Sequence, residues 1–310
     1  MSQRRPGLER RTARVLHEAL VSPVGAALAV LLAIAWTVPM AGLVLNSFSV
    51  GSEATSSGWW TLLGNRALTL DNYRDALAGS SALPQGLIRY LVNSLAIALP
   101  ATALPLFLGC MAAYALAWMP VKGSGAVLMI IIGLQLIPLQ MALLPLLEIC
   151  SQGWTVGELI IIPQLDVSDS YVPLWIAHTA FALPLAIFLL YGSISALPRD
   201  VIEAARIDGA SHAVILARIV LPLALPAIAA FTCLQFILTW NDLLVALAFT
   251  RGTTQVAPIT AFLVQAQGRL GADPGLLAAA AVLAVALPVV LVMLVHRVYA
   301  RGLLGSVINR

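Results

Sequence analysis

The chain is poor in charged residues, cysteine and histidine for its length. Only 10% of its 310 residues are charged and 60% are hydrophobic, whereas soluble domains carry about 25% charged residues. The three cysteines and four histidines are dispersed, without the short spacings typical of metal sites. This composition excludes an ordinary water-soluble domain and a closed disulfide framework, and we expect no metal site.

The sequence also lacks the motifs of self-sufficient transporters and enzymes. No stretch matches the G-x-x-x-x-G-K-[ST] pattern that cradles nucleotide phosphates. No convergent set of His, Cys and carboxylate residues indicates an enzyme. A proton-coupled carrier needs buried ionisable residues, and Asp242 is almost alone inside an apolar segment. We therefore expect a non-catalytic chain, with a secondary transporter as the less favoured alternative.

The chain contains long apolar runs without charged residues. A transmembrane helix needs about 20 mostly apolar residues, and six gaps between charged side chains are long enough. They lie at residues 24–46, between 89 and 122, between 122 and 148, between 169 and 199, at residues 222–249, and between 273 and 297. The sequence therefore predicts an all-α integral membrane protein with six transmembrane helices, most of them containing proline.

The basic residues predict the orientation, because cytoplasmic loops retain Lys and Arg. With six spans both termini share one side, and that side carries twelve of the 17 basic residues. We therefore predict cytoplasmic ends at 1–23 and 298–310 and a membrane domain at 24–297. Its external parts are 47–88, 148–171 and 250–274, and its cytoplasmic loop is 196–221. The same bias accounts for the net charge of +3, so no nucleic-acid partner is expected.

The cytoplasmic loop has the pattern of two short helices joined at a glycine. Pro198 suits a first helical turn, Gly209 permits the left-handed conformation that ends a helix, and Ser211 can cap the next helix. Brief connections fix this loop to two spans, so whatever moves the loop moves both spans.

The same loop resembles the signature of the permease subunits of binding-protein-dependent ABC importers. That signature is EAA, three residues, G, nine residues, I, one residue and LP. The chain matches every fixed position, at Glu203, Ala204, Ala205, Gly209, Ile219, Leu221 and Pro222. The resemblance implies that the loop is the coupling helix of a type I importer permease, with Glu203 pairing with a basic residue of an ATPase. Arg206 and Asp208 are further candidates for this contact.

The resemblance also implies the partners and the location. We expect two separate ATP-binding-cassette subunits that bind ATP and magnesium, a second, homologous permease subunit forming a heterodimer, and an extracytoplasmic solute-binding protein. No cofactor is expected in this chain. The expected location is the lipid bilayer of the bacterial cytoplasmic (inner) membrane, and the C-terminal tail is a candidate contact with the ATPases.

Further runs resemble the carbohydrate-importer branch, in particular the smaller, six-span permease of the maltose transporter. They occur in the same order along the chain: Leu68-Thr69-Leu70-Asp71-Asn72-Tyr73, Asn93-Ser94-Leu95, Ile137-Pro138-Leu139-Gln140, Thr179-Ala180-Phe181-Ala182-Leu183-Pro184, Ile207-Asp208-Gly209-Ala210, Trp240-Asn241-Asp242 and Arg301-Gly302-Leu303. A sugar, such as an α-glucoside or a glycosylglycerol, is the implied solute. A glycerophosphodiester, polyamine or amino acid stays open, although low charge in the spans disfavours charged solutes.

Polar side chains inside spans are costly and usually face a cavity or a partner helix. Each of the following is a candidate for the solute pathway or, alternatively, for hydrogen bonds between helices: Asn93, Gln135, Gln140, Gln235, Trp240, Asn241 and Asp242. In the external loop 250–274, the resemblance implies a contact with the binding protein, for which Gln255, Gln265 and Gln267 are candidates. A solvated connection is the alternative for that loop.

Overall fold

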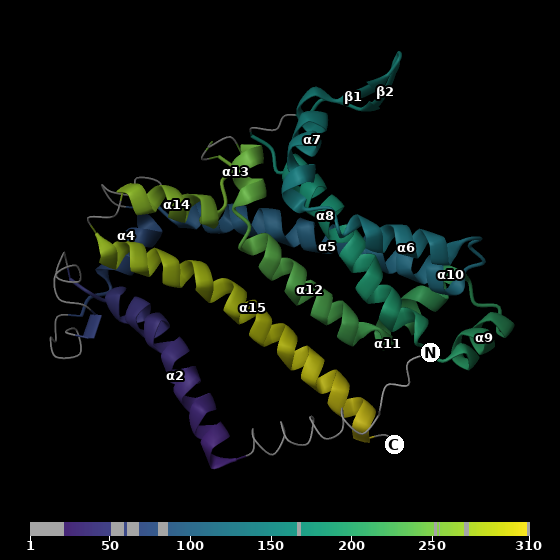
Figure 1. Cartoon of the computed structure of the whole chain (residues 1–310), viewed down its shortest axis with the longest axis horizontal. Coiled ribbons are helices and arrows are strands. Elements are labelled where there is room, and N and C mark those ends of the chain that lie inside the picture. Colours follow the sequence, from purple (N-terminus) through teal and green to yellow (C-terminus); the bar gives the residue numbers. More distant parts are fainter. Residues whose placement is uncertain are drawn as a thin grey trace, which may run out of the picture. The chain divides into compact units, whose positions relative to one another are not determined.

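The computed structural model describes residues 22–50, 59–60, 68–79, 86–165, 169–250, 253, 255–269 and 273–308. These residues are mostly helical, and Figure 1 labels their elements. The chain divides into two compact units, Met1–Ala76 with Leu270–Val282, and Leu77–Arg269 with Leu283–Arg310. Each unit is considered separately.

The first unit contains α2 (Pro23–Asn46), most of α4 (Asp71–Ala78) and the beginning of α15 (Pro274–Ile308). Asn72 of α4 donates from Nδ2 to the carbonyls of Ser47 at 3.0 Å and Ser49 at 2.8 Å. The hydroxyl of Tyr73 lies 2.5 Å from Oγ of Ser47. Asn72 and Tyr73, at the end of the predicted 68–73 run, therefore fix α4 to the segment that follows α2.

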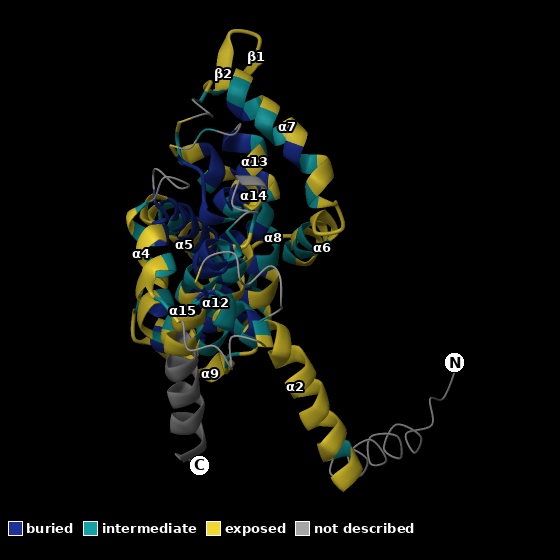
Figure 2. Ribbon diagram, turned by 90° about the vertical axis from the view of Figure 1, so that its left-hand side faces the viewer, coloured by how far each residue is buried: buried dark blue, intermediate teal, exposed yellow. Residues whose placement is uncertain are grey.

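Most side chains of α2 are exposed, as Figure 2 shows. Trp36, for example, is 80% exposed in the middle of this apolar helix. A helix that is apolar on all sides is stable only when buried or surrounded by lipid. The surface of α2 is therefore suited to hydrocarbon or to another membrane helix.

The second unit is built around α5 (Ile88–Trp118) and α8 (Val172–Ser195), with α12 (Leu225–Trp240) packed against both. The approach of α5 to α8 is close because Gly109 faces Ala186. A Cβ atom at Gly109 would lie only 2.8 Å from Cβ of Ala186. Small residues allow such contacts between membrane helices, where van der Waals packing provides much of the attraction.

Two of the six predicted spans are bent. Within the part of the chain that the structure describes, four helices are long and apolar enough to cross a membrane, and the number rises to six if each of two bent pairs is one span. One pair is α6 (Ser124–Leu134) with α7 (Leu139–Gln152), which meet at 97°. The other joins His212–Leu223 to Leu225–Trp240 at 76°. The third and fifth predicted segments are therefore each a bent pair of helices.

A proline accounts for the bend between α6 and α7. In the fifth predicted segment, the carboxylate of Asp242 starts a separate short helix after α12. Pro138 has no N–H and disfavours helical conformation in the residue before it, so α6 ends and α7 begins there. After α12 ends at Trp240, Asp242 accepts from the backbone N–H groups of Val245 at 3.4 Å and Ala246 at 3.0 Å. These bonds start a separate helix, α13 (Leu244–Thr250).

The predicted external segments contain regular structure. Residues 148–171 include a hairpin of β1 (Trp154–Val156) and β2 (Leu159–Ile162), paired antiparallel. Residues 250–274 include α14 (Ile259–Arg269). Helix α15 extends to Ile308, so the predicted tail 298–310 begins inside a helix.

Candidate coupling loop and solute pathway

The predicted coupling loop folds as α9 (Arg199–Ile207), α10 (His212–Ile215), the π-helical turn η2 (Leu216–Val220) and α11 (Leu221–Leu223). Gly209 has φ of +80°, and the N–H of Ala210 donates to the carbonyl of Ala205 at 3.0 Å. Ser211 then caps α10 by accepting from the N–H of Val214 at 3.4 Å. Two short helices joined at a glycine, as predicted, are therefore present.

One face of α9 packs into the protein and the other is exposed. Ile202 is fully buried and Ala205 is 9% exposed, and both belong to the apolar cluster that contains Leu190 and Ile194 of α8. Ala205 therefore packs within its own chain. Of the other predicted coupling residues, Ile219 and Leu221 are half-buried, and the exposed ones are Glu203, Ala204, Arg206, Asp208, Gly209 and Pro222.

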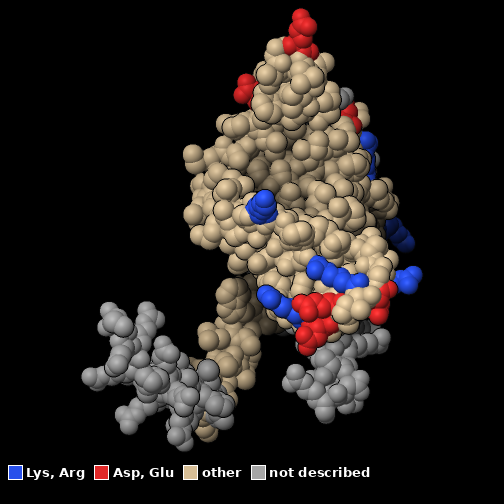
Figure 3. All heavy atoms as spheres, turned by 90° about the vertical axis from the view of Figure 1, so that its right-hand side faces the viewer, with Lys and Arg blue, Asp and Glu red and all other residues tan. Residues whose placement is uncertain are grey.

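The exposed side of α9 carries acidic and basic side chains close together. Arg199, Asp200, Glu203, Arg206 and Asp208 lie within ten positions of one another and are not buried. Figure 3 shows Lys, Arg, Asp and Glu side chains gathered at this end, below a surface with few charges. Ile207 is 87% exposed beside them. The exposed side of α9 thus presents charged groups of both signs and an apolar side chain.

The loop is also bonded to α5. The guanidinium of Arg206 donates to the carbonyl of Trp118, and the hydroxyl of Tyr114 lies 2.9 Å from Nδ1 of His212. The indole of Trp118 donates to the carbonyl of Ile194 in α8 at 3.1 Å. The sequence predicted a loop attached to two spans, and the structure adds α5 as a third.

Three of the predicted pathway residues are buried with partners inside the protein. Asn93, 3% exposed, bonds to Gln255, Ala257 and Tyr171. Gln235 donates to the carbonyl of Ala101 at 3.4 Å and to the hydroxyl of Thr239 at 3.1 Å. Trp240 is 2% exposed and donates to the carbonyl of Ala284 at 3.0 Å. Gln235 and Trp240 therefore make the interhelical bonds that were the alternative to solute contact, whereas Asn93 bonds to non-helical segments of its own chain.

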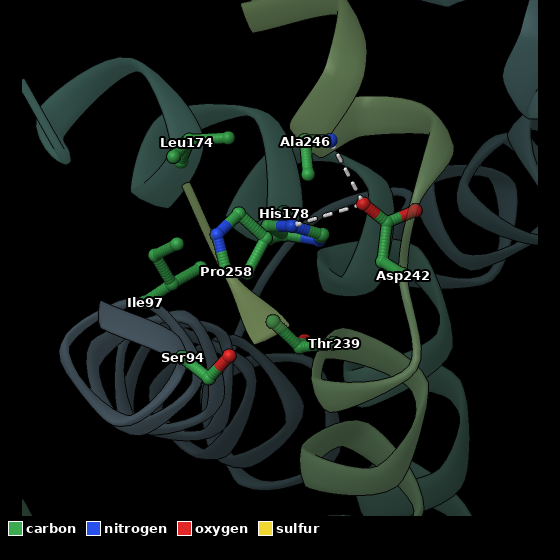
Figure 4. A pocket seen from close by; sticks show the side chains of 8 residues that line it. All are labelled: Ser94, Ile97, Leu174, His178, Thr239, Asp242, Ala246 and Pro258. Carbon is green, nitrogen blue, oxygen red and sulfur yellow. Dashed lines mark hydrogen bonds and ion pairs between the residues drawn. The ribbon is translucent and has the colours of Figure 1, made fainter. Parts of the chain in front are cut away.

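Asp242 lies in a small site beside α13 that is lined by both polar and apolar side chains, drawn in Figure 4. Its Oδ2 is 3.8 Å from Nε2 of His178, and Ser94 and Thr239 also line the site. The enclosed volume is about 10 Å³, close to the least that holds one water molecule. This site is too small for a sugar, so Asp242 here positions α13 rather than a solute.

The remaining pathway candidates are exposed. Gln135 lines an apolar groove of about 640 Å³ between the α6–α7 bend and α8. Pro138, Pro145 and Pro184 are among the other residues that line it. Gln140 and Asn241 are exposed, and Asn241 donates to the carbonyl of Ile237 at 2.9 Å. The predicted binding-protein contacts Gln255, Gln265 and Gln267 are exposed as well.

Residues 105–305 match the family described as "Binding-protein-dependent transport system inner membrane component". The chain belongs to this permease family. It is 39% identical over 281 residues to the osmoprotective compounds uptake permease protein GgtD of Synechocystis sp., with 89% of each chain covered. It is 41% identical over 269 residues to the alpha-glucoside transport system permease protein AglG of Rhizobium meliloti, covering 84% of this chain and 68% of AglG.

A solved structure has the same fold as this permease. A chain of a bacterial ABC transporter involved in the import of the acidic polysaccharide alginate superposes with a TM-score of 0.70 at 20% identity, covering 91% of this chain and 97% of that chain. The same kind of transporter has also been solved in complex with a periplasmic protein bound to an alginate pentasaccharide. These likenesses, with the helices described above, place the permease among type I importer folds.

Sequence reasoning missed the residues that attach the loop to α5. Tyr114, Trp118 and His212 carry no motif, and aromatic residues in an apolar helix are usually packing residues. Their only signal is spacing, because Tyr114 and Trp118 are four residues apart and so share one face of α5.

Proposed function

We propose that this permease forms half of the translocation pathway for a sugar or glycoside delivered by an extracytoplasmic binding protein. ATP hydrolysis in two separate subunits drives the transport, and a second, homologous permease forms the other half. The proposal depends mainly on the coupling loop, which matches the family signature at every fixed position and is bonded to helices of the second unit.

The bonds of the loop suggest how motion passes into the membrane. When the ATPases close, the subunit that holds this loop pushes on the exposed face of α9 near Glu203. The bonds from Arg206 to Trp118 and from His212 to Tyr114 transfer this displacement to α5. The buried Ile202 transfers it to α8 through packing. Because packed helices move as rigid bodies, these three contacts reorient the pathway helices together.

The charge pattern supports the orientation in the membrane. Lys122 follows the end of α5 that is bonded to Arg206, and Arg199 lies on α9, whereas Arg89 lies at the opposite end of α5. Cytoplasmic loops retain basic residues. We therefore propose that the α9 end lies in the cytoplasm with both termini, and that α14 lies on the side of the binding protein.

The relatives support a neutral glycoside as the solute. AglG is named for alpha-glucosides and GgtD for osmoprotective compounds. The exposed groove beside α8 is lined by apolar residues and the uncharged Gln135. Such a surface suits the apolar faces of a sugar ring better than an ionised group. The alternatives are a glycerophosphodiester, a polyamine or an amino acid.

Reconstitution of the complete importer in proteoliposomes tests the proposal. We suggest comparing maltose, glucosylglycerol and glycerophosphocholine as probes, each with the cognate binding protein. We expect ATP-dependent uptake of one of the first two, with ATP hydrolysis stimulated only by the loaded binding protein. Uptake of glycerophosphocholine alone contradicts the solute class, and uptake without the ATPase subunits contradicts the mechanism.

A further inference from the structure

The segment before α14 is held to α5 by two adjacent polar side chains. Asn93 donates from Nδ2 to the carbonyls of Gln255 and Ala257, both at 2.9 Å. Ser94, the next residue, accepts from the backbone N–H of Ile259 at 2.8 Å. Residues 255–259 are called the strap here, because they cross α5 at these three points.

The bonds from Asn93 and Ser94 satisfy groups that have no helical partner. Ile259 is the first residue of α14, so its N–H lies ahead of the first helical hydrogen bond, from Phe262 to Pro258. The hydroxyl of Ser94 therefore acts as a helix cap supplied by another helix. The two carbonyls that Asn93 binds lie in non-helical backbone, where a buried oxygen without a donor is costly.

Burial makes this arrangement specific. Asn93 is 3% and Ser94 2% exposed, and Val256, Ala257 and Ile259 of the strap are also buried. Tyr171 donates its hydroxyl to Oδ1 of Asn93 at 2.7 Å, which fixes the amide with its donors toward the strap. All of these residues belong to the second unit. Buried polar networks with every group satisfied define one geometry, because any shift leaves a group unpaired.

We propose that Asn93 and Ser94 are positioning residues for docking of the binding protein, through the strap and α14. The strap includes Gln255, and α14 carries the exposed Gln265 and Gln267. This inference rests on the proposed function, which places these glutamines on the side of the binding protein. Asn93 does not contact the solute; it sets where the three amides lie.

The bonds from Asn93 and Ser94 to the strap are called the clamp here. Amide hydrogen exchange of the complete importer in nanodiscs tests the clamp without requiring transport. Asn93→Leu removes the amide, and Ser94→Ala removes the cap. We expect exchange of residues 255–269 to accelerate by about fivefold or more in each variant, since one lost hydrogen bond is worth about that factor. Thr102→Val is the matched control, because this buried hydroxyl of α5 donates only within its own helix, to Ala98 at 2.7 Å. Unchanged exchange in both clamp variants overturns the proposal.

ATP hydrolysis tests the positioning role. Hydrolysis is measured against the concentration of the cognate binding protein, loaded with whichever of the three probes supports uptake. Asn93→Leu should raise the half-saturating concentration by about tenfold, with basal and maximal rates near those of the unaltered importer. Tyr171→Phe keeps both bonds from Asn93 to the strap, so it should shift the half-saturating concentration much less. Thr102→Val should not shift it.

The outcomes separate the inference from the proposed function. A fall in basal rate, maximal rate and complex yield together, with no change in half-saturation, means a purely structural role and overturns the docking role. An unaltered importer that no loaded binding protein stimulates overturns the proposed function and the docking role together. The exchange measurement still decides the clamp itself.

Discussion

The hydroxyl of Tyr114 lies 2.9 Å from Nδ1 of His212, although 98 positions separate these residues in the sequence. Tyr114 is 1% exposed inside α5, whereas His212 opens α10 on the exposed loop. Together with the bond from Arg206 to Trp118, this contact attaches the coupling loop to a helix that is distant in sequence. The same helix holds the strap before α14 through Asn93 and Ser94. One helix of 31 residues, about 46 Å long by its rise per residue, thus contacts both proposed protein-binding segments.

The Tyr114 contact should be measurable by removing one oxygen. Tyr114→Phe keeps the buried ring and removes the bond to His212, with an expected cost of about 1 kcal/mol. We expect faster amide exchange in α10 and weaker coupling of ATP hydrolysis to uptake, measured as ATP consumed per solute. Tyr191→Phe, in α8, is a useful comparison for loss of a tyrosine hydroxyl. Unaltered exchange in α10 contradicts the role of Tyr114.

Charge reversal on α9 tests the coupling surface. Glu203→Lys should reduce stimulated ATP hydrolysis by about tenfold or more, equivalent to 1.4 kcal/mol of lost interaction. Glu203 is exposed, and substitutions at exposed sites change stability by only about 0.5 kcal/mol, so yield and thermal stability should hold. Glu148→Lys, at an exposed acid of α7, is the matched reversal on the predicted external side and should leave hydrolysis unchanged. Equal effects of the two substitutions contradict a specific role for Glu203.

Gly209 allows a test of backbone geometry without steric conflict. Its φ is +80°, and a Cβ atom there would meet nothing within 4 Å. Gly209→Val should cost about 1–2 kcal/mol in the left-handed conformation and distort the end of α9, which lowers stimulated hydrolysis. Gly209→Asn should retain most of the activity, because asparagine tolerates this conformation. If both variants hydrolyse ATP like the unaltered importer, the angle between α9 and α10 has no role in coupling.

The close approach of α5 to α8 should be sensitive to a single methyl group. Gly109→Ala places Cβ 2.8 Å from Cβ of Ala186, and overpacking of this kind costs about 1–3 kcal/mol. Gly192→Ala, in α8, adds the same group where nothing lies within 4 Å and should not lower the melting temperature. Thermal unfolding of the purified importer measures both variants. A Gly109→Ala importer as stable as its Gly192→Ala counterpart indicates that the two helices separate at little cost.

Trp240 distinguishes packing from solute binding. The ring stacks on Phe236 with centroids 5.6 Å apart and is buried. Trp240→Ala should destabilise the importer by about 3–5 kcal/mol. Trp240→Phe should lose mainly the bond to Ala284 and keep the same half-saturating solute concentration in uptake assays. A raised half-saturating concentration at unchanged stability in Trp240→Phe shows instead that Trp240 contacts the solute.

The sequence by itself determined the membrane class, the apolar segments and the two short helices joined at Gly209. Each of these follows from local information: hydrophobic length, and the spacing of Pro198, Gly209 and Ser211. The turn at Gly209 depends on the conformational freedom of one residue, so it could be predicted without knowing its surroundings.

Only the tertiary structure decided which polar residues of the apolar segments are buried with hydrogen-bond partners and which line a groove. Asn93, Gln135 and Gln235 are alike in sequence, as uncharged polar residues in apolar segments. The fold buries Asn93 and Gln235 against carbonyls more than 130 positions away and leaves Gln135 on a groove. A hydrogen bond depends on distances between chain segments, and these distances exist only after the helices have packed. The bend at Pro138 has the same origin, because a proline permits a break and neighbouring helices fix its angle.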